Sequence, residues 1–404
     1  MSAPAPAIPA RPPRWGRQTS LFQTRRPAFW IYAVLLVATG VYTVAEQSVF
    51  HRMSPSGWAL SWLLLALYAL PVFVVVYLLD LYEREPLSLV LGALAWGAIV
   101  ATSLAGLANA GWGLVVARLG GPAFASRWTA ALTAPVTEEI LKGAGVVFIA
   151  LIATEEIDDE LDGFVYGAIC GLGFAVVEDV FYFVAVFGGS TSGILAGFYV
   201  RVISSGLYGH VMYTGLTGMG IAYAVSRRGE VSLRKRVGVA VGLFALAALG
   251  HFLWDSPFLD LFPDRVRSIG DLLQIPFAAA VKGLPLLAFV IVLVHLARRR
   301  ERRWLRTALA AEVDSPAISS VELGILLDAH ARRRARRAMR ARAGEGAARL
   351  LKRLQREQIT LAMIRARGTA DDDPTLVRQR EYCRSLRDAL AAMPGAAPAV
   401  GASG

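Results

Sequence analysis

The sequence predicts an all-α protein: a polytopic membrane helix bundle of about eight transmembrane helices, followed by a basic, helical cytosolic tail. Of its 404 residues, 55% are hydrophobic, and several apolar segments exceed 18 residues with few charges. A helix needs about 20 consecutive apolar residues to cross a bilayer. The 42 Lys and Arg outnumber the 31 Asp and Glu, and the excess lies in loops and near the C-terminus. Together these observations exclude a soluble protein.

Composition divides the chain into four parts. Residues 1–27 are rich in Pro and Arg without an apolar core, so they are predicted to be a disordered cytosolic arm rather than a signal peptide. Residues 28–296 hold the membrane-spanning bundle, and residues 297–393 form the basic helical tail. Residues 394–404 consist mostly of Pro, Gly and Ala and are predicted to be disordered.

Apolar segments within the bundle give the order of the predicted spans. Each is long enough to cross a membrane as a helix. The predicted spans are residues 28–44, 57–79, 87–108, 130–152, 163–187, 201–225, 237–254 and 275–296.

The distribution of basic residues predicts the orientation. An even number of spans places both termini on one side, and the arginines and lysines next to the spans are concentrated on that side. The positive-inside rule therefore predicts a multi-pass cell-membrane protein with both termini in the cytoplasm. A basic tail at the inner leaflet is expected to contact anionic lipid, and nucleic acid is not expected as a partner.

The fourth span carries charged residues where a membrane helix should be apolar. Glu138, Glu139 and Lys142 lie in its middle, and each would cost on the order of 3 kcal/mol there unless it faced a polar cavity and found a partner. Glu138 and Lys142 are four residues apart and can pair, whereas Glu139 is rotated by about 100° and can point into a cavity. The alternative is a buried, purely structural ion pair.

Two adjacent carboxylates, Glu178 and Asp179, lie in the aromatic second half of the fifth span. The first half of this span has glycines at four-residue spacing, which form a small-residue face that lets another helix approach closely. These glycines are Gly163, Gly167 and Gly171.

The sixth and seventh spans each contain a histidine with a polar residue one turn later. Thr214 follows His210, and Asp255 follows His251. A single histidine in such a place is more often a hydrogen-bonded core residue, but four spans with ionisable residues favour a shared site. Counted from the predicted outer ends of their helices, Glu138, Glu178 and His210 lie about 12 to 14 Å deep if Arg201 reaches the outer headgroups.

These residue types favour metal-assisted hydrolysis. Imidazoles and carboxylates are ligands of a zinc-like divalent ion, and a catalytic site keeps one position open for water. The bound water reaches a pKa near 7, and a nearby glutamate can pass its proton to a leaving amine. The HExxH signature is absent, and no serine or cysteine has a suitably spaced base. The alternative is a transporter or channel with the same residues as a proton or cation relay, but the internal repeat expected there is not visible.

As an ordered set, the motifs resemble the PrsW family of intramembrane metalloproteases. The resemblance covers roughly residues 80–296 and includes an acidic stretch that ends in Pro86. The matching motifs are Glu138-Glu139-x-x-Lys142, Phe174-x-x-x-Glu178, His210 with Thr214 and Gly218 after it, and His251-x-x-Trp254-Asp255.

The resemblance implies a protease-like bundle, similar in arrangement to type II CAAX prenyl endopeptidases, that cleaves membrane-anchored proteins such as anti-sigma factors. It implies a catalytic group of Glu138, Glu139 and Lys142 and a divalent metal ion, zinc being the expected one. By spacing, we favour Glu139 as the general base and Glu138 as the partner of Lys142, although the opposite assignment stays open. The implied metal ligands are Glu178, His210 and His251, and the supporting residues are Asp179, Thr214 and Asp255.

Two of these supporting residues depart from the family pattern, which in many relatives has Asn where this chain has Asp179 and Asp255.

In the tail, residues 321–343 and 347–367 have apolar residues at helical spacing with dense arginine between them. They are predicted to be helices that pack weakly or lie on anionic lipid. The arginine run from His330 to Arg342 is either a solvated helix face or a contact with lipid or a partner.

Overall fold

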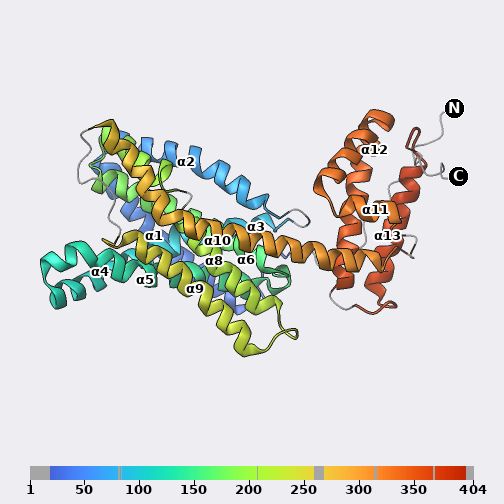
Figure 1. Ribbon diagram of the computed structural model, residues 1–404, viewed down its shortest axis with the longest axis horizontal. Coiled ribbons are helices and arrows are strands. Elements are labelled where there is room, and N and C mark those ends of the chain that lie inside the picture. The colour runs from blue at the N-terminus through green and yellow to red at the C-terminus, as the bar shows by residue number, and fades with distance from the viewer. Residues whose placement is uncertain are drawn as a thin grey trace. The chain divides into compact units, whose positions relative to one another are not determined.

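The computed structural model describes residues 19–396 except 81, 83, 207, 259–267, 314, 316, 367 and 368. These residues form helices joined by turns and contain no β-strand, which confirms the predicted all-α class (Figure 1). Residues from Gln18 to Ala297 form one compact unit, and residues from Arg298 onward belong to a second. Most of the two segments predicted to be disordered lies outside the described residues.

Six helices within the described residues are long and apolar enough to cross a membrane. Two of them combine an α-helix with further helical pieces. They are α1 (Pro27–Met53), α2 (Pro55–Tyr77), the run of α3 (Leu87–Ala95), η1 (Trp96–Ala101) and α4 (Thr102–Gly120), α6 (Glu160–Phe181) with η3 (Tyr182–Val186), α9 (Leu233–Asp255) and α10 (Ile269–Ala310).

The other two predicted spans correspond to α5 (Pro122–Ile152) and α8 (His210–Ser226). Helix α5 has 31 residues but carries the charged group in its middle, and α8 has only 17 residues. Both pack inside the bundle, where α5, α8 and α9 contact one another. Helices α5 and α8, which are not among the six apolar spans, therefore meet at the centre of the bundle.

The predicted helix over residues 201–225 is wrong at its start, because the chain breaks before His210. A π-helical turn, η4 (Tyr199–Ile203), is followed by a non-helical segment that contains Gly206 and Gly209. Glycine weakens a helix because it loses more backbone freedom than other residues. The hydroxyl of Ser205 donates to the carbonyls of Val200 and Arg201 and so satisfies groups that a continuing helix would have used.

This break corrects two expectations. His210 is the first residue of α8 rather than a residue in the middle of a span, and Arg201 does not reach toward headgroups. The Arg201 guanidinium instead pairs with the carboxylates of Glu178 and Asp179. Its position therefore gives no reference for the depth of His210.

The predicted glycine face of α6 is confirmed, since α8 lies directly against it. A Cβ atom at Gly171 would lie 2.2 Å from the carbonyl oxygen of His210, and one at Gly167 would lie 2.2 Å from that of Thr214. Gly163 makes the same kind of approach further along α8. Because lipid is as apolar as the side chains, membrane helices associate through such close packing. The glycines thus fix where the first turn of α8 stands.

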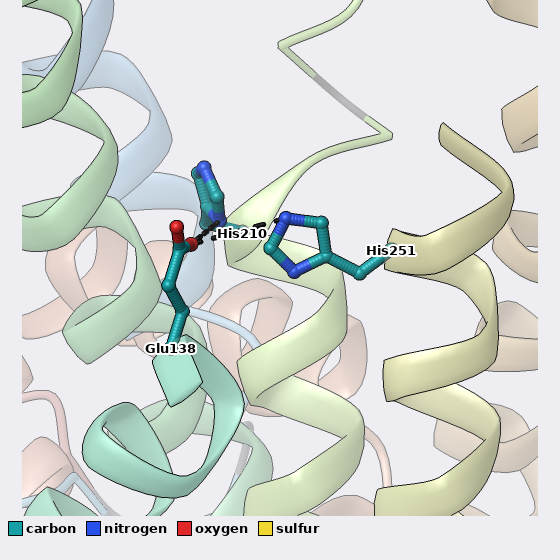
Figure 2. Close-up of side chains that lie close together, drawn as sticks. All are labelled: Glu138, His210 and His251. Atoms are coloured by element: carbon teal, nitrogen blue, oxygen red, sulfur yellow. Dashed lines mark ion pairs between the residues drawn. The ribbon is translucent and has the colours of Figure 1, made fainter. Parts of the chain in front are cut away.

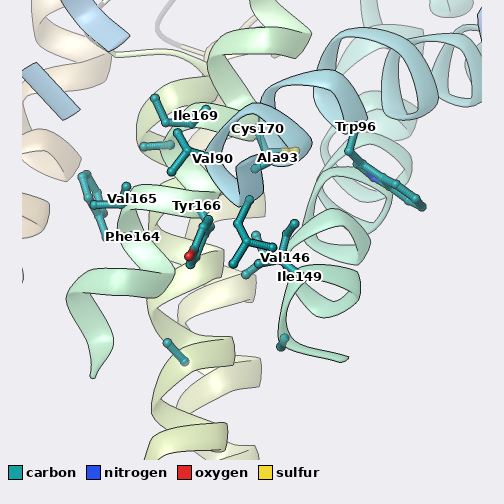
Figure 3. Close-up of a cluster of buried hydrophobic side chains, with 14 of the residues drawn as sticks. Val90, Ala93, Trp96, Val146, Ile149, Phe164, Val165, Tyr166, Ile169 and Cys170 are labelled. Carbon is teal, nitrogen blue, oxygen red and sulfur yellow. The ribbon is translucent and has the colours of Figure 1, made fainter. Parts of the chain in front are cut away.

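A cluster of buried apolar side chains joins α3, η1, α5 and α6 (Figure 3). Trp96 is the largest of them, and its indole N–H donates to the carbonyl of Leu141 at 2.8 Å. A Cβ at Gly97 would lie 1.8 Å from the carbonyl oxygen of Cys170, so η1 rests on the α6 backbone. This packing holds α5 against α6 one turn from the charged residues of α5.

The second unit contains the end of α10 and three more helices, α11 (Ser320–Leu326), α12 (Ala329–Ala366) and α13 (Pro374–Ala391). Helix α12 is kinked at Gly344, where φ is 82°, and this kink lies in the gap between the two predicted tail helices. The unit encloses a core of leucines with at most 1% exposure, so its helices pack more closely than the sequence suggests. These leucines are Leu354, Leu361, Leu376 and Leu386.

Candidate active site and metal centre

Three charged side chains of α5 lie at the centre of the bundle and are almost fully enclosed. Glu138 is 3% exposed, and Glu139 and Lys142 are 0% exposed. The Lys142 ammonium lies 2.7 Å from Glu139 Oε1 and 3.5 Å from Glu138 Oε2. The expected pairing of Lys142 with Glu138 is therefore the longer of two contacts.

Glu139 is held by groups from three helices. Besides the Lys142 ammonium, the Nδ1 of His251 lies 3.1 Å from Oε1, and the Thr214 hydroxyl donates to Oε2 at 3.3 Å. Both oxygens of this carboxylate therefore have partners. A carboxylate fixed from three sides is well suited to orient its neighbours and poorly suited to move.

Glu138 differs because one of its oxygens, with the Lys142 ammonium 3.5 Å away, accepts no hydrogen bond in the described part of the chain and is open in that sense. Oε1 accepts a hydrogen bond from the Asn109 amide at 3.0 Å, whereas Oε2 is buried without a hydrogen-bond donor among the described residues. This Oε2 atom lies 3.8 Å from His210 Nδ1 and 3.8 Å from His251 Nε2. Figure 2 shows the three side chains converging from α5, α8 and α9.

Asn109 was not predicted as part of the site. Its carbonyl oxygen accepts from the Thr137 hydroxyl at 2.5 Å while its amide holds Glu138. The predicted third span ended at residue 108, one residue before this asparagine. The sequence did contain a signal: the residues on both sides of Asn109 are mostly apolar as far as residue 117, so a helix could continue past it.

Each histidine contacts at least one carboxylate through a ring nitrogen. His210 Nε2 lies 3.0 Å from Glu178 Oε2, and its Nδ1 lies 2.8 Å from the Lys142 ammonium. Because an ammonium only donates, Nδ1 accepts and Nε2 carries the hydrogen that is donated to Glu178. The two imidazole rings are 5.2 Å apart at 77°.

His251 is bracketed by acids at both ring nitrogens. Its Nδ1 faces Glu139, and its Nε2 lies 3.3 Å from Asp255 Oδ2, one helical turn later. The Tyr213 ring stacks on the imidazole at 5.2 Å and 15°. The structure thus brings the predicted supporting residues Thr214 and Asp255 into contact with the predicted catalytic and metal residues.

Glu178 and Asp179 share a cation that the sequence analysis did not assign to the site. Arg201 Nη2 lies 2.5 Å from Glu178 Oε2, and Arg201 Nε bonds Asp179. The sequence signal was an arginine bounded on both sides by apolar residues, which we read as the end of a span.

The donor set fits a divalent metal ion. Ligand atoms of Glu138, His210 and His251 all lie within 4.8 Å of one another. The set combines two imidazoles with an open, buried carboxylate oxygen, which is the chemistry that zinc sites use. Around it, five carboxylates face two permanent cations, so a divalent ion would offset most of the excess negative charge. Glu178, which the resemblance placed among the ligands, is outside this set of three and lies 3.0 Å from His210 Nε2.

A second acidic cluster lies where α6 begins. Ligand atoms of Asp80, Glu85 and Asp162 lie within 4.8 Å of one another, and the Tyr166 hydroxyl donates to Glu85. The N-cap residue Asp159 accepts hydrogen bonds from the backbone of α6. Burial, together with the charge of nearby Asp80, raises the pKa of Asp159 to about 7.

Comparison with known proteins decides the family. A family model described as PrsW family intramembrane metalloprotease matches residues 85–298, just over half of the chain. The chain belongs to the PrsW family. The PrsW match contains every side chain of the central site and ends where the second compact unit begins. It confirms the family expected from the ordered motifs and favours a hydrolase over a transporter or channel.

One PrsW relative shows the degree of sequence similarity. The chain is 35% identical over 113 residues to Protease PrsW from Geobacillus kaustophilus (strain HTA426). This stretch covers 27% of the present chain and 45% of that protein, so the chain spans less than half of the curated relative it matches. No solved structure matches the chain. The PrsW match leaves the second unit outside the family region.

Proposed function

We propose that this chain is a metal-dependent intramembrane endopeptidase that cleaves membrane-anchored proteins. The observation that carries the proposal is the open Oε2 atom of Glu138, buried between His210 and His251 in the region that matches the metalloprotease family. Zinc is the ion of choice because two imidazoles and one carboxylate are a common zinc ligand set.

In this proposal Glu138, His210 and His251 hold the ion. A divalent ion here would polarise a substrate carbonyl and bring the pKa of water near 7. Glu139 orients His251 through the 3.1 Å contact, and Glu178 orients His210 through the 3.0 Å contact. Carboxylate partners of this kind fix the ring and tautomer of metal-binding histidines. The contacts therefore favour a different division of roles from the expected one, in which spacing favoured Glu139 as the base and the family resemblance implied Glu178 as a ligand.

We further propose that both termini are cytoplasmic and that the site opens toward the extracytoplasmic side. The charge distribution supports this orientation, because the arginine run from Arg298 to Arg306, in the last part of α10, directly follows the apolar part of that helix. Anionic lipid near this run and a membrane-anchored anti-sigma factor as substrate are the proposed partners, the latter by family resemblance.

Metal analysis of the full chain in detergent tests the proposal. We expect about one tightly held zinc ion per chain, since ligands on three helices need a cation to offset their burial. The His210→Ala, His251→Ala double variant should lose it, and should also lose cleavage of a membrane-anchored reporter in liposomes. Stoichiometric zinc in the double variant would exclude the assignment.

A further inference from the structure

Arg201 connects to the histidine site through a shared oxygen atom. Its Nη2 lies 2.5 Å from Glu178 Oε2, and the Nε2 of His210 lies 3.0 Å from the same Oε2. Arg201 lies in η4, before the break, and His210 is the first residue of α8, after it, so residues from both sides of the break meet on one carboxylate. The position of Glu178 is thus set jointly by the guanidinium and the imidazole.

The guanidinium itself is fixed from three sides. Its Nε bonds Asp179, its Nη2 bonds Glu178, and its Cζ lies 3.7 Å from the centroid of the Tyr182 ring. The Arg201 side chain is 22% exposed, so solvent does little to loosen these contacts. A planar guanidinium that bonds two carboxylates and stacks on an aromatic ring has little freedom to turn.

The fixed position of Glu178 in turn determines which nitrogen of His210 faces the metal site. With Glu178 fixed, His210 donates through Nε2, and Nδ1 keeps its lone pair on the side of Glu138, 3.8 Å away. The Lys142 ammonium contacts this Nδ1 but has a closer partner in Glu139 at 2.7 Å. An ion can therefore replace the ammonium at Nδ1 without leaving Lys142 unpaired.

We infer that Arg201 is a positioning residue of the metal site: it holds Glu178 so that His210 presents Nδ1 to the ion. The inference rests on the proposed function. A competing role is simple charge balance, in which Arg201 only neutralises the adjacent carboxylates of Glu178 and Asp179. The two roles differ in what happens when one of these carboxylates is removed together with the arginine.

The test compares zinc affinity, by chelator competition, in full-length variants purified in detergent. Arg201→Gln should weaken zinc binding by about 10- to 100-fold, the usual effect of losing an outer partner of a ligand. Its Co²⁺ complex should show an altered visible absorption spectrum, because the His210 ring is no longer fixed. The zinc affinity of Arg201→Lys should lie between those of wild type and Arg201→Gln, because an ammonium keeps the charge but cannot bond both carboxylates in one plane.

The double variant Asp179→Asn, Arg201→Gln separates the two roles, because it removes one negative and one positive charge. Under the positioning role it still binds zinc weakly; a return to wild-type affinity would show that Arg201 only balances charge. The same variant carries the test if Arg201→Gln alone does not fold. Unchanged affinity in Arg201→Gln would also overturn the inference.

Arg227 provides the matched control. It too is an arginine that ties the α8 region to an acid of α6, since its Nε donates to Glu160 at 2.8 Å, but it lies at the far end of α8. Arg227→Gln should lower thermal stability and leave zinc affinity within about 2-fold; an equal loss of affinity there would refute a role specific to Arg201. If wild type and the His210→Ala, His251→Ala variant bind zinc equally, the proposed function fails instead.

Discussion

Glu139 Oε1 lies 3.1 Å from His251 Nδ1, although the two residues are 112 positions apart in the chain. Both side chains are buried, and the contact joins α5 to α9. In the proposed function this contact separates the roles of the two neighbouring glutamates, because Glu139 positions the His251 ring through Nδ1. The adjacent Glu138 keeps an open oxygen toward the near side of the same ring.

The first prediction separates these two roles. Glu138→Gln should lower zinc affinity at least about 100-fold while the protein still folds, since the open oxygen loses its charge and no buried ion pair depends on it alone. Glu139→Gln should instead destabilise the fold by about 3–5 kcal/mol, the usual effect of removing one partner from a buried pair. Zinc titration and thermal melting of both purified variants check this.

The reverse result has a clear meaning. If Glu139→Gln keeps its metal and its melting temperature but loses cleavage of a membrane-anchored reporter, Glu139 is the base that spacing alone favours. Lys142→Met is a useful companion variant, because it removes the cation that contacts both acids without changing either carboxylate.

The second prediction concerns the close approach of α6 and α8. Gly171→Ala should weaken zinc binding and lower the melting temperature, because its Cβ would lie 2.2 Å from the His210 carbonyl and push the first turn of α8 outward. Gly242→Ala in α9 is the control, since a Cβ there meets no atom within 4 Å. Alanine should stabilise that helix by about 0.5–1 kcal/mol. Equal behaviour of the two variants would contradict the packing argument.

The fold was predictable from the sequence where a local pattern determines it. Apolar length gave the helices, and four-residue glycine spacing gave the face on which α8 rests. The break before His210 was not predictable, because Tyr199 to Val225 is mostly apolar and the local glycines weaken a helix without ending it. Tertiary contacts of Gly206 also favour the turn. One such contact is the Tyr68 hydroxyl, which donates to the Gly206 carbonyl at 2.9 Å.

The site was predictable as a set of residues but not as an arrangement. Motif order brought together the acids and histidines that the structure places around one centre. Spacing on a single helix paired Lys142 with Glu138, whereas contacts from Thr214 and His251 hold Glu139 where the ammonium is nearer. Arg201 could not be assigned, because its partners lie 22 and 23 positions away on another helix.

The third prediction is a pH dependence at the start of α6. Because burial raises the pKa of Asp159 from 3.8 to about 7, the folded protein binds this proton more tightly than the unfolded chain. The stability that this gives is present below about pH 4 and is lost as the pH rises to about 7. Asp159→Asn keeps the N-cap and should therefore melt at a higher temperature than wild type at pH 8, with a smaller difference at pH 5.

Melting curves of both proteins at these two pH values are the measurement. Asp158→Asn, one position earlier and exposed, is the matched control. A difference between wild type and Asp159→Asn that stays constant from pH 5 to pH 8 would mean that the carboxyl does not change its charge in this range.

The fourth prediction is the orientation in the membrane, which we test by labelling single cysteines with a membrane-impermeant reagent in intact cells. Ser192 and Arg334 are exposed positions in α7 (Thr191–Phe198) and α12, while both native cysteines, Cys170 and Cys383, are buried. The positive-inside rule places Arg334 in the cytoplasm. Ser192→Cys should therefore label in intact cells, and Arg334→Cys only after permeabilisation. Labelling of position 334 but not 192 in intact cells would invert the topology and place entry to the site on the cytoplasmic side.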